Sequence, residues 1–403
     1  MGTAGETTGA GVRIDLNELT GALGDSITVL PIVVSLALLT PLSLAHTLVA
    51  FGVFQIVWGI VYGIPLSVEP MKALAGLAIA GAISLGELVA AGLIAGVVLL
   101  VAGRYGVVGA IERVVGLPVV RGIQLAVALL LGVTGLQLAA GNPPVAAAAT
   151  AVVLLVALAG YRDASALVVL GIGGAVAVFL GGVPTPTLPD ITVFASGGPS
   201  FTVGALEGAA AQLAMTVGNA AVATALLCSD LFDEEVSADR LAESMGVMTL
   251  AALPMGGLPM CHGSGGLAGK HAFGARTGGA NVILGVGYLA LALIAVVVVA
   301  FPMAVLGVLL VLVAVELARV SMESDDRLLT VGVGVLGVAA NVGIAFVVGA
   351  VVGGLLRKAD VRSRGDPRMT FAELFDRAVE YTVDEETVRE ALDERRSERG
   401  DDR

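Results

Sequence analysis

Charged side chains are scarce in this 403-residue chain, where Asp, Glu, Lys and Arg together make up 14% of the residues. A soluble globular domain carries about 25%. Aromatic residues are also few, at 4%, whereas apolar residues reach 57% and the mean hydropathy is +0.94. A water-soluble core cannot bury that much apolar surface. The chain is therefore expected to lie in a lipid bilayer.

Cysteines and basic residues are few as well. Two cysteines form no disulfide framework, and a net charge of −12 excludes a basic nucleic-acid-binding surface. The sequence has no Walker loop, dinucleotide fingerprint or nucleophile–base constellation, so neither an enzyme nor a cofactor is indicated. Cys261 and His262 are neighbours, but no further Cys or His clusters near them, so no metal site is expected.

Long apolar runs follow one another almost without pause, and about 20 helical residues cross a bilayer. They predict an all-α polytopic membrane protein with about fourteen spans, at 23–40, 46–62, 65–81, 84–102, 119–139, 144–160, 164–182, 203–228, 240–256, 258–272, 279–299, 302–319, 328–340 and 342–356. The expected parts are a cytoplasmic N-terminal segment (1–22), a first membrane repeat (23–182), an extracytoplasmic linker (183–202), a second repeat (203–356) and a cytoplasmic acidic helical tail (357–403).

The basic residues predict the orientation. Threaded through these spans, nearly all Lys and Arg, Lys270 among them, fall at one side, and of the 22 basic residues only Lys72 falls more than three residues inside a span. Because Lys and Arg are enriched in cytoplasmic loops, we expect both termini in the cytoplasm and the chain in the plasma membrane.

An internal repeat is visible at a constant offset. Gly24-Asp25 matches Gly218-Asn219, and 63–66 (GIPL) matches 257–260 (GLPM), both 194 positions apart. Such short matches also arise by chance in Gly/Ala-rich sequence, but the shared offset favours a true repeat. Because each half has an odd number of spans, the second half is expected to be inverted, as in many transporters.

Two spans are interrupted at matching positions of the repeat. Pro65 and Pro70 prevent a continuous helix through 63–72, and Pro70 suits the first turn of a new one. Glycines around Ser264 leave backbone N–H groups open in 257–266. Two half-helix N-termini that face each other would bind one anion; the alternative is a pair of packing kinks. The candidate substrate-binding residues are Ser67, Glu69, Pro70, Met71, Lys72, Cys261, His262, Gly263, Ser264, Gly265, Gly266, Asp25, Gln212 and Asn219.

Glu69 and Lys72 are ionisable residues within a span, which are costly there and indicate function. One interpretation is a mutually neutralising structural pair. In the other, Lys72 attracts the anion and Glu69, repelled by it, takes up a proton. Glu69 is thus the candidate for proton coupling.

These segments resemble a known family. The stretches 67–73 and 259–278 are similar to the two signature motifs of the molybdate transporter family related to the SulP sulfate permeases, and 17–25 and 212–224 are similar to two further motifs. The resemblance implies a seven-plus-seven inverted repeat with core and gate domains, an anion between spans three and ten, and molybdate uptake. The family usually has Gln at the positions of Glu69 and Lys270. The SulP permeases carry a C-terminal STAS domain, for which 357–403 is too short, and this favours the molybdate branch.

A secondary transporter that imports a tetrahedral oxyanion, molybdate first, is therefore expected, with proton coupling as a hypothesis. The alternatives are a sulfate permease of the same fold and, more remotely, a nucleobase permease or a non-transporting receptor. The expected partners are the oxyanion, protons and the bilayer, with no nucleic acid and with a homodimer left open.

Overall fold

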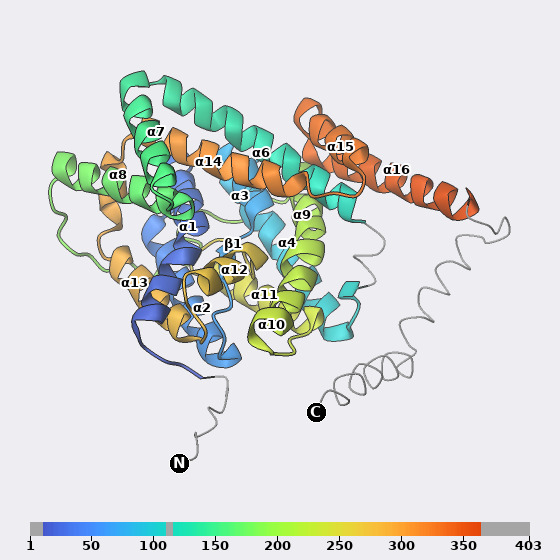
Figure 1. Ribbon diagram of the computed structural model, residues 1–403, viewed down its shortest axis with the longest axis horizontal. Coiled ribbons are helices and arrows are strands. Elements are labelled where there is room, and N and C mark those ends of the chain that lie inside the picture. Colours follow the sequence, from blue (N-terminus) through green and yellow to red (C-terminus); the bar gives the residue numbers. More distant parts are fainter. Residues whose placement is uncertain (1–10, 110–115, 364–403) are drawn as a thin grey trace, which may run out of the picture.

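The computed structural model describes residues 11–109 and 116–363 and is mostly helical (Figure 1). In chain order its elements are α1 (Leu16–Leu39), α2 (Leu44–Tyr62), β1 (Glu69–Pro70), α3 (Lys72–Ile79), α4 (Leu85–Tyr105), α6 (Leu117–Ala140), α7 (Pro143–Leu158), η1 (Arg162–Ala164), α8 (Ser165–Gly181), α9 (Val203–Met215), the π-helix η2 (Thr216–Val222), α10 (Ala223–Phe232), α11 (Ala238–Ala252), β2 (Met260–Cys261), α12 (Ser264–Ala272), α13 (Gly279–Ala292), the 3₁₀-helix η3 (Ala295–Ala300), α14 (Met303–Ser321), α15 (Arg327–Ala339) and α16 (Val342–Ser363).

Five helices in the described part are by themselves long and apolar enough to cross a membrane, or six if the bent helix α1 is included. They are α2, α4, α6, the α9–α10 run and α14. Five shorter apolar helices accompany them. The helices overlap the predicted apolar runs, although the run 279–299 is divided between α13 and η3. Each of the two spans that were expected to be interrupted consists of an extended segment followed by a short helix.

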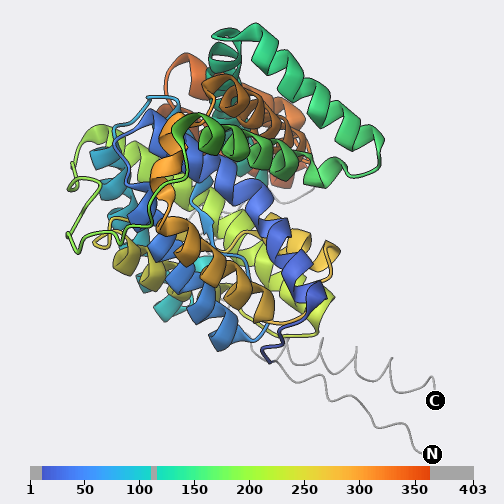
Figure 2. The same cartoon turned by 90° about the vertical axis from the view of Figure 1, so that its left-hand side faces the viewer.

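The helices form two groups. In the inner group, α2 packs along α13 and α4 along α11, while in the outer group α6 packs along α14 and α15. Figures 1 and 2 show the outer group, which also contains α7, α8 and α16, lying across one side of the inner group. Contacts of α1 with α14 and of α3 with α6 join the two groups. The short helix α3 therefore lies inside the molecule, with Ala73 to Ile79 all buried, whereas α12 buries Gly266, Leu267 and Lys270 and exposes Gly265 and Ala272.

Helix α1 begins at Leu16, within the segment 1–22 that the sequence assigns to the aqueous N-terminal region. The start of the helix packs against the protein through Glu18, which is 2% exposed. Its carboxylate accepts hydrogen bonds from the backbone N–H groups of Arg276, Thr277 and Ala280, at 2.9–3.1 Å. A charged residue in a polar stretch thus satisfies the buried turn between α12 and α13, and the start of α1 is docked there.

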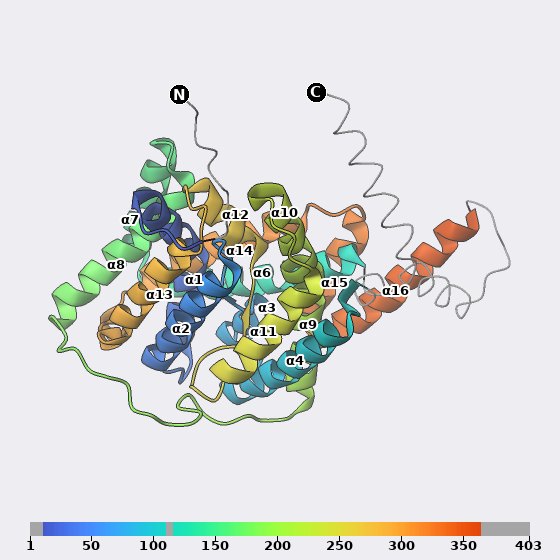
Figure 3. The same ribbon diagram turned by 90° about the horizontal axis from the view of Figure 1, so that it is seen from below.

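The linker between the two halves follows the ends of the inner helices (Figure 3). Its backbone N–H groups donate to inner-group carbonyls: Thr187 to Leu293 and Ser200 to Gly86. His46 of α2 also contacts it, with Nε2 lying 2.7 Å from the Asp190 carbonyl oxygen. Segment 182–202 is therefore fixed to the inner group although it has no helix or strand of its own.

Close helix packing in the outer group depends on glycine. A Cβ on Gly135 of α6 would lie 2.8 Å from the Gly307 carbonyl oxygen, and a Cβ on Gly307 of α14 would lie 2.5 Å from that of Gly135. Atoms this close are backbone atoms that cannot rotate away. Small residues let membrane helices approach in this way.

Gly307→Ala is therefore expected to separate α6 from α14 and destabilise the protein by about 1–3 kcal/mol, the usual cost of overpacking. Gly287→Ala is the matched control, because a Cβ at this α13 position meets no atom within 4 Å. Thermal unfolding in detergent measures both. Equal melting temperatures for the two variants would contradict the packing argument.

Candidate functional site

Two short strands meet in the interior of the inner group. Strand β1 pairs antiparallel with β2, with Glu69 opposite Cys261 and Pro70 opposite Met260. The Met71 N–H extends the ladder by donating to the Pro259 carbonyl at 2.9 Å. Because α3 and α12 start within three residues of the strands, the pairing places the beginnings of both short helices close together.

Proline and threonine account for the local chain path. Pro65 and Pro70 have no N–H and do not extend a helix, so the chain from α2 stays extended until Lys72. On the other side, the Thr249 hydroxyl of α11 accepts from the Met260 N–H at 3.1 Å and donates to the Met260 carbonyl at 2.9 Å. Backbone groups that would be unpaired in an apolar interior are thus satisfied.

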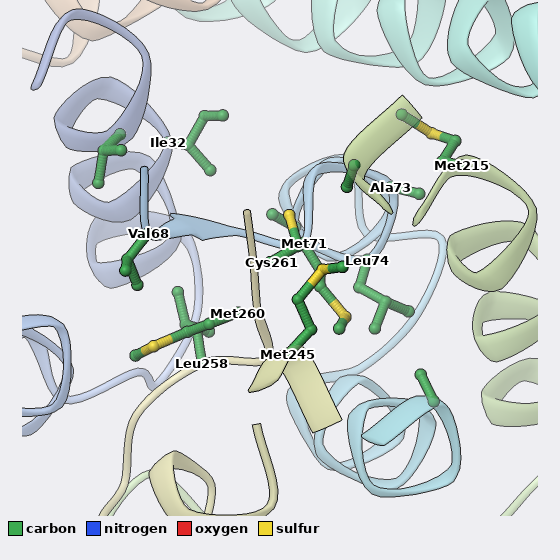
Figure 4. Packing of buried hydrophobic residues seen from close by; sticks show 14 of the residues in the cluster. Ile32, Val68, Met71, Ala73, Leu74, Met215, Met245, Leu258, Met260 and Cys261 are labelled. Carbon is green, nitrogen blue, oxygen red and sulfur yellow. The ribbon is translucent and has the colours of Figure 1, made fainter. Parts of the chain in front are cut away.

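Apolar side chains surround the strand pair. Met71, Met260 and Cys261 are at most 5% exposed, and Figure 4 shows them with Met245 and Leu258 around the crossing of the two strands. Methionine adapts to irregular gaps, which an extended segment between helices leaves. The strand pair is therefore held in a packed, apolar surrounding.

Carboxylates lie at the polar side of the strand pair. Glu69 and Asp25 are both 0% exposed. The Ser67 hydroxyl lies between them, 2.5 Å from Asp25 Oδ1 and 3.1 Å from Glu69 Oε1. Lys72, the first residue of α3, places its Nζ 2.5 Å from Glu69 Oε2. The pair spans the junction of β1 and α3.

The Glu69 carboxyl group lies directly against the first turn of α12. A Cβ on Gly263 would overlap all three atoms of this carboxyl group. A Cβ on Gly266 would overlap Glu69 Oε1 and also Ser67 Oγ and Asp25 Oδ1. Glycine at these two positions therefore lets acidic side chains approach the positive, N-terminal end of the helix.

Lys270 corrects the sequence analysis, which placed it among the basic residues at one membrane side. In the structure it is 0% exposed, and its Nζ lies 3.0 Å from Asp25 Oδ2. It also donates to Gln55 Oε1 at 3.2 Å and Asn281 Oδ1 at 2.8 Å. The basic motif around Lys270 looks like a membrane-side loop, but Lys270 lies on the buried side of α12, whereas the next two residues, His271 and Ala272, are half-buried and exposed.

Gln212 of α9 satisfies the start of α3. Its Oε1 accepts from the N–H groups of Ala73 and Leu74, at 2.9 and 3.2 Å, and its Nε2 donates to Thr216 at 2.8 Å. Thr216 begins the π-helix η2, and such irregular turns are frequent at functional sites. The start of α3 is thus already capped by the protein.

His262 links the two halves at the strand pair. Its Nδ1 lies 2.8 Å from the Ser67 carbonyl oxygen and its Nε2 lies 2.8 Å from the Ser244 hydroxyl. A carbonyl only accepts, so Nδ1 carries a proton and donates. Trp58 and Tyr62 pack edge-on against the ring. His262 therefore orients the segment that carries Ser67.

The predicted residues thus fall into distinct places. Asp25, Ser67, Glu69, Lys72, Gly263 and Gly266 meet at the start of α12, with Gln212 at the start of α3. Pro70, Met71 and Cys261 form the strand pair, Ser264 begins α12, and Gly265 is exposed beside it. Asn219 lies in η2, and its side chain is outside the described residues. Sequence reasoning missed Lys270, Gln55 and Asn281.

Solved structures with a similar fold include anion transporters. The transmembrane domain of a cyanobacterial bicarbonate transporter, BicA, superposes with a TM-score of 0.59 and 17% identity over 82% of this chain and 97% of that chain. The murine Solute Carrier 26 family member A9 anion transporter, in the inward-facing state, superposes with a TM-score of 0.62 and 13% identity over 86% of this chain and 69% of that chain.

Similar sequences are named molybdate transporters. Molybdate transporter 2 of Arabidopsis thaliana is 30% identical over 370 residues, covering 77% of this chain and 80% of that protein. Molybdate transporter 1 of the same plant is 32% identical over 372 residues, covering 78% and 82%. The family model described as "Molybdate transporter of MFS superfamily" matches residues 17–131 and 204–317.

The protein is a multi-pass membrane transporter that shares its fold with anion transporters of known structure. The chain belongs to the molybdate transporter family. The family model covers both strands, both short helices and every residue of the buried carboxylate–lysine cluster.

Gly266→Ala is expected to lower the melting temperature, because its Cβ would displace the Glu69, Ser67 and Asp25 side chains together. Gly265→Ala is the matched control next to it, since a Cβ there meets no atom within 4 Å. Thermal unfolding of the purified variants without substrate measures the difference. A Gly266→Ala protein as stable as Gly265→Ala would show that the acidic groups do not lie against α12.

Proposed function

We propose that this chain is a secondary transporter that imports a tetrahedral oxyanion, with molybdate as its substrate. The observation that carries the proposal is the position of the Glu69 carboxylate. It lies between the Lys72 ammonium group and the first turn of α12, and two glycines are needed to admit it. The protein thus holds an acidic group of its own where a cation and a helix N-terminus favour negative charge.

An incoming oxyanion would use the same groups. Lys72 is the one member of the cluster with appreciable exposure, since its side chain is 20% exposed and the Glu69 side chain is fully buried. The ammonium would exchange its ion pair with Glu69 for one with the oxyanion, and the positive, N-terminal end of α12 would stabilise the bound anion. The start of α3 contributes less, because Gln212 already accepts from its first N–H groups.

Proton coupling follows from this exchange. Once Lys72 turns to a dianion, Glu69 is left buried, without its cation and beside a like charge. Both conditions favour the protonated carboxyl group. Asp25 keeps its own cation, Lys270. Glu69 is therefore the group that takes up a proton together with the oxyanion.

The proposed architecture has fourteen spans in two inverted seven-span repeats, with β1–α3 and β2–α12 as the two interrupted spans. The pattern of helix contacts supports it. If the two halves are equivalent, α2 corresponds to α11, α4 to α13, α3 to α12 and α1 to α9. The α2–α13 contact then corresponds to the α11–α4 contact, and the α3–α9 contact to the α12–α1 contact. All four contacts are present. Antiparallel pairing of β1 with β2 is also what a two-fold axis between the halves produces.

In this arrangement the inner group is the core domain that carries the site, and the outer group is the gate domain. Segments 23–182 and 203–356 form the two repeats and 183–202 is an extracytoplasmic linker. The termini are placed in the cytoplasm and the protein in the plasma membrane, because Lys and Arg other than Lys72 and Lys270 gather at one side of the threaded spans. A homodimer is proposed as the assembly.

Purified protein in proteoliposomes is expected to take up radiolabelled molybdate with saturation, and uptake is expected to fall when unlabelled tungstate or sulfate is added. Protein-free liposomes give the background. Saturable sulfate uptake that molybdate does not inhibit would replace molybdate by sulfate as the substrate. Uptake of neither anion above background would contradict the oxyanion proposal.

Glu69→Gln keeps the shape of the side chain but carries no titratable proton. Molybdate uptake by this variant is expected to lose its acceleration by an acidic exterior, while exchange of internal for external molybdate at equal pH persists, because Lys72 and the start of α12 are unchanged. Parallel uptake assays with and without a pH gradient measure both. Acceleration as large as in the unmodified protein would remove Glu69 from proton coupling.

A further inference from the structure

The Lys270 ammonium group lies in a cage of oxygen atoms. Four oxygens surround Nζ: Asn281 Oδ1 at 2.8 Å, Asp25 Oδ2 at 3.0 Å, Gln55 Oε1 at 3.2 Å and the Leu66 carbonyl at 3.5 Å. They come from α13, α1, α2 and the extended segment before β1. Lys270 and its three side-chain partners are all 0% exposed.

The cage is arranged around a positive charge. Both amide side chains turn their oxygen to Lys270 and use their nitrogen as a donor to other groups. Asn281 Nδ2 donates to the Leu66 carbonyl at 2.5 Å. Gln55 Nε2 donates to the Val68 carbonyl at 3.2 Å and to Asp25 at 2.8 Å. The carbonyls on either side of Ser67 are thus held by amides whose orientation the ammonium fixes.

A simple ion pair does not require these partners. Asp25 alone neutralises Lys270, and an ammonium group has three donor hydrogens. Here one carboxylate and three neutral oxygens converge on a single centre, the mixture of ligands that binds a hard cation. The other acidic groups near the cage have their own donors: Glu69 pairs with Lys72, and Glu18 accepts from the turn before α13.

We propose that Lys270 is a tethered cation: its ammonium group occupies a cation site formed by Asp25, Gln55, Asn281 and the Leu66 carbonyl. It fixes the Leu66–Val68 backbone, and so the Ser67 hydroxyl, without a metal ion. Lys270 is a positioning residue in this role, because it acts on the oxyanion site through Ser67. The part it plays in transport rests on the proposed function, whereas the cation site itself does not.

Removal of the ammonium group should then leave a site for a free cation. In Lys270→Ala the carboxylate and the three neutral oxygens remain, with space where the side chain was. Ammonium and ethylammonium ions are small and carry N–H donors, whereas choline is bulky and has none. An ammonium or ethylammonium ion that binds the folded state, and not the unfolded state, stabilises the folded state.

The experiment is thermal unfolding of purified Lys270→Ala in ammonium chloride, ethylammonium chloride or choline chloride at equal ionic strength, without molybdate. In choline chloride, Lys270→Ala is expected to melt at a lower temperature than the unmodified protein. In the two ammonium salts, its melting temperature is expected to be about 2–4 °C higher than in choline chloride. The unmodified protein is expected to melt at the same temperature in all three salts.

Asp25→Asn added to Lys270→Ala is the matched control. It keeps the shape of the cage and removes its negative charge, so the stabilisation by ammonium salts should disappear. Lys270→Gln is a second single variant with a smaller cavity, and it should show the same preference for ammonium over choline. A single variant that can be purified only when ammonium is present supports the proposal in the same way.

Equal melting temperatures of both single variants in all three salts, or failure of both to fold in any salt, would overturn the tethered cation. An ammonium effect that survives Asp25→Asn would do so as well. Because no substrate is added, these outcomes are independent of whether molybdate is transported, which the uptake assay decides separately.

Discussion

The pairing of β1 with β2 is the constraint on which the rest of this structure depends. An apolar interior gives unpaired backbone groups no water, so a chain that leaves the helix there must find partners within the protein. Two residues of each half provide them for each other, and Thr249 and His262 serve neighbouring groups. The strand pair thereby permits two helices to begin inside the molecule, and their beginnings create the electrostatic conditions of the site.

Charge balance is the second organising feature. The cluster contains two carboxylates, Asp25 and Glu69, and two ammonium groups, Lys72 and Lys270, so the fully ionised cluster is neutral. Loss of one partner from a buried ion pair costs about 3–5 kcal/mol. The two pairs differ in surroundings: the Asp25–Lys270 pair is enclosed by amides, and the Glu69–Lys72 pair faces the start of α12 with a partly exposed lysine. The first pair suits a fixed structural role and the second suits exchange with a ligand.

Many of the helix positions along the chain could be predicted from the sequence, because apolar length and proline position are local signals. The extended stretches that contain Pro65, Pro70 and Pro259 were predictable from such local signals. Lys270 was not predictable in the same way, since Asp25 and Gln55, which create much of its environment, are far from it in the chain, and only Asn281 lies on the next helix, α13. The burial of Glu18 was not predictable for a related reason: its polar neighbours in the sequence indicate water, but its partners are backbone N–H groups of a distant turn. The site residues themselves remain a proposal, supported by their convergence on α12.

The anchored linker has a mechanical consequence. Helix α8 ends at Gly181, and the first fixed point beyond it is Thr187, bound to the Leu293 carbonyl at the end of α13. A chain of six residues spans at most roughly 20 Å when fully extended. The segment from Gly181 to Thr187 therefore limits how far α8, and with it the outer group, can be displaced from the inner group. Lengthening the stretch between α8 and Thr187 would relax that limit without altering any residue of the proposed site.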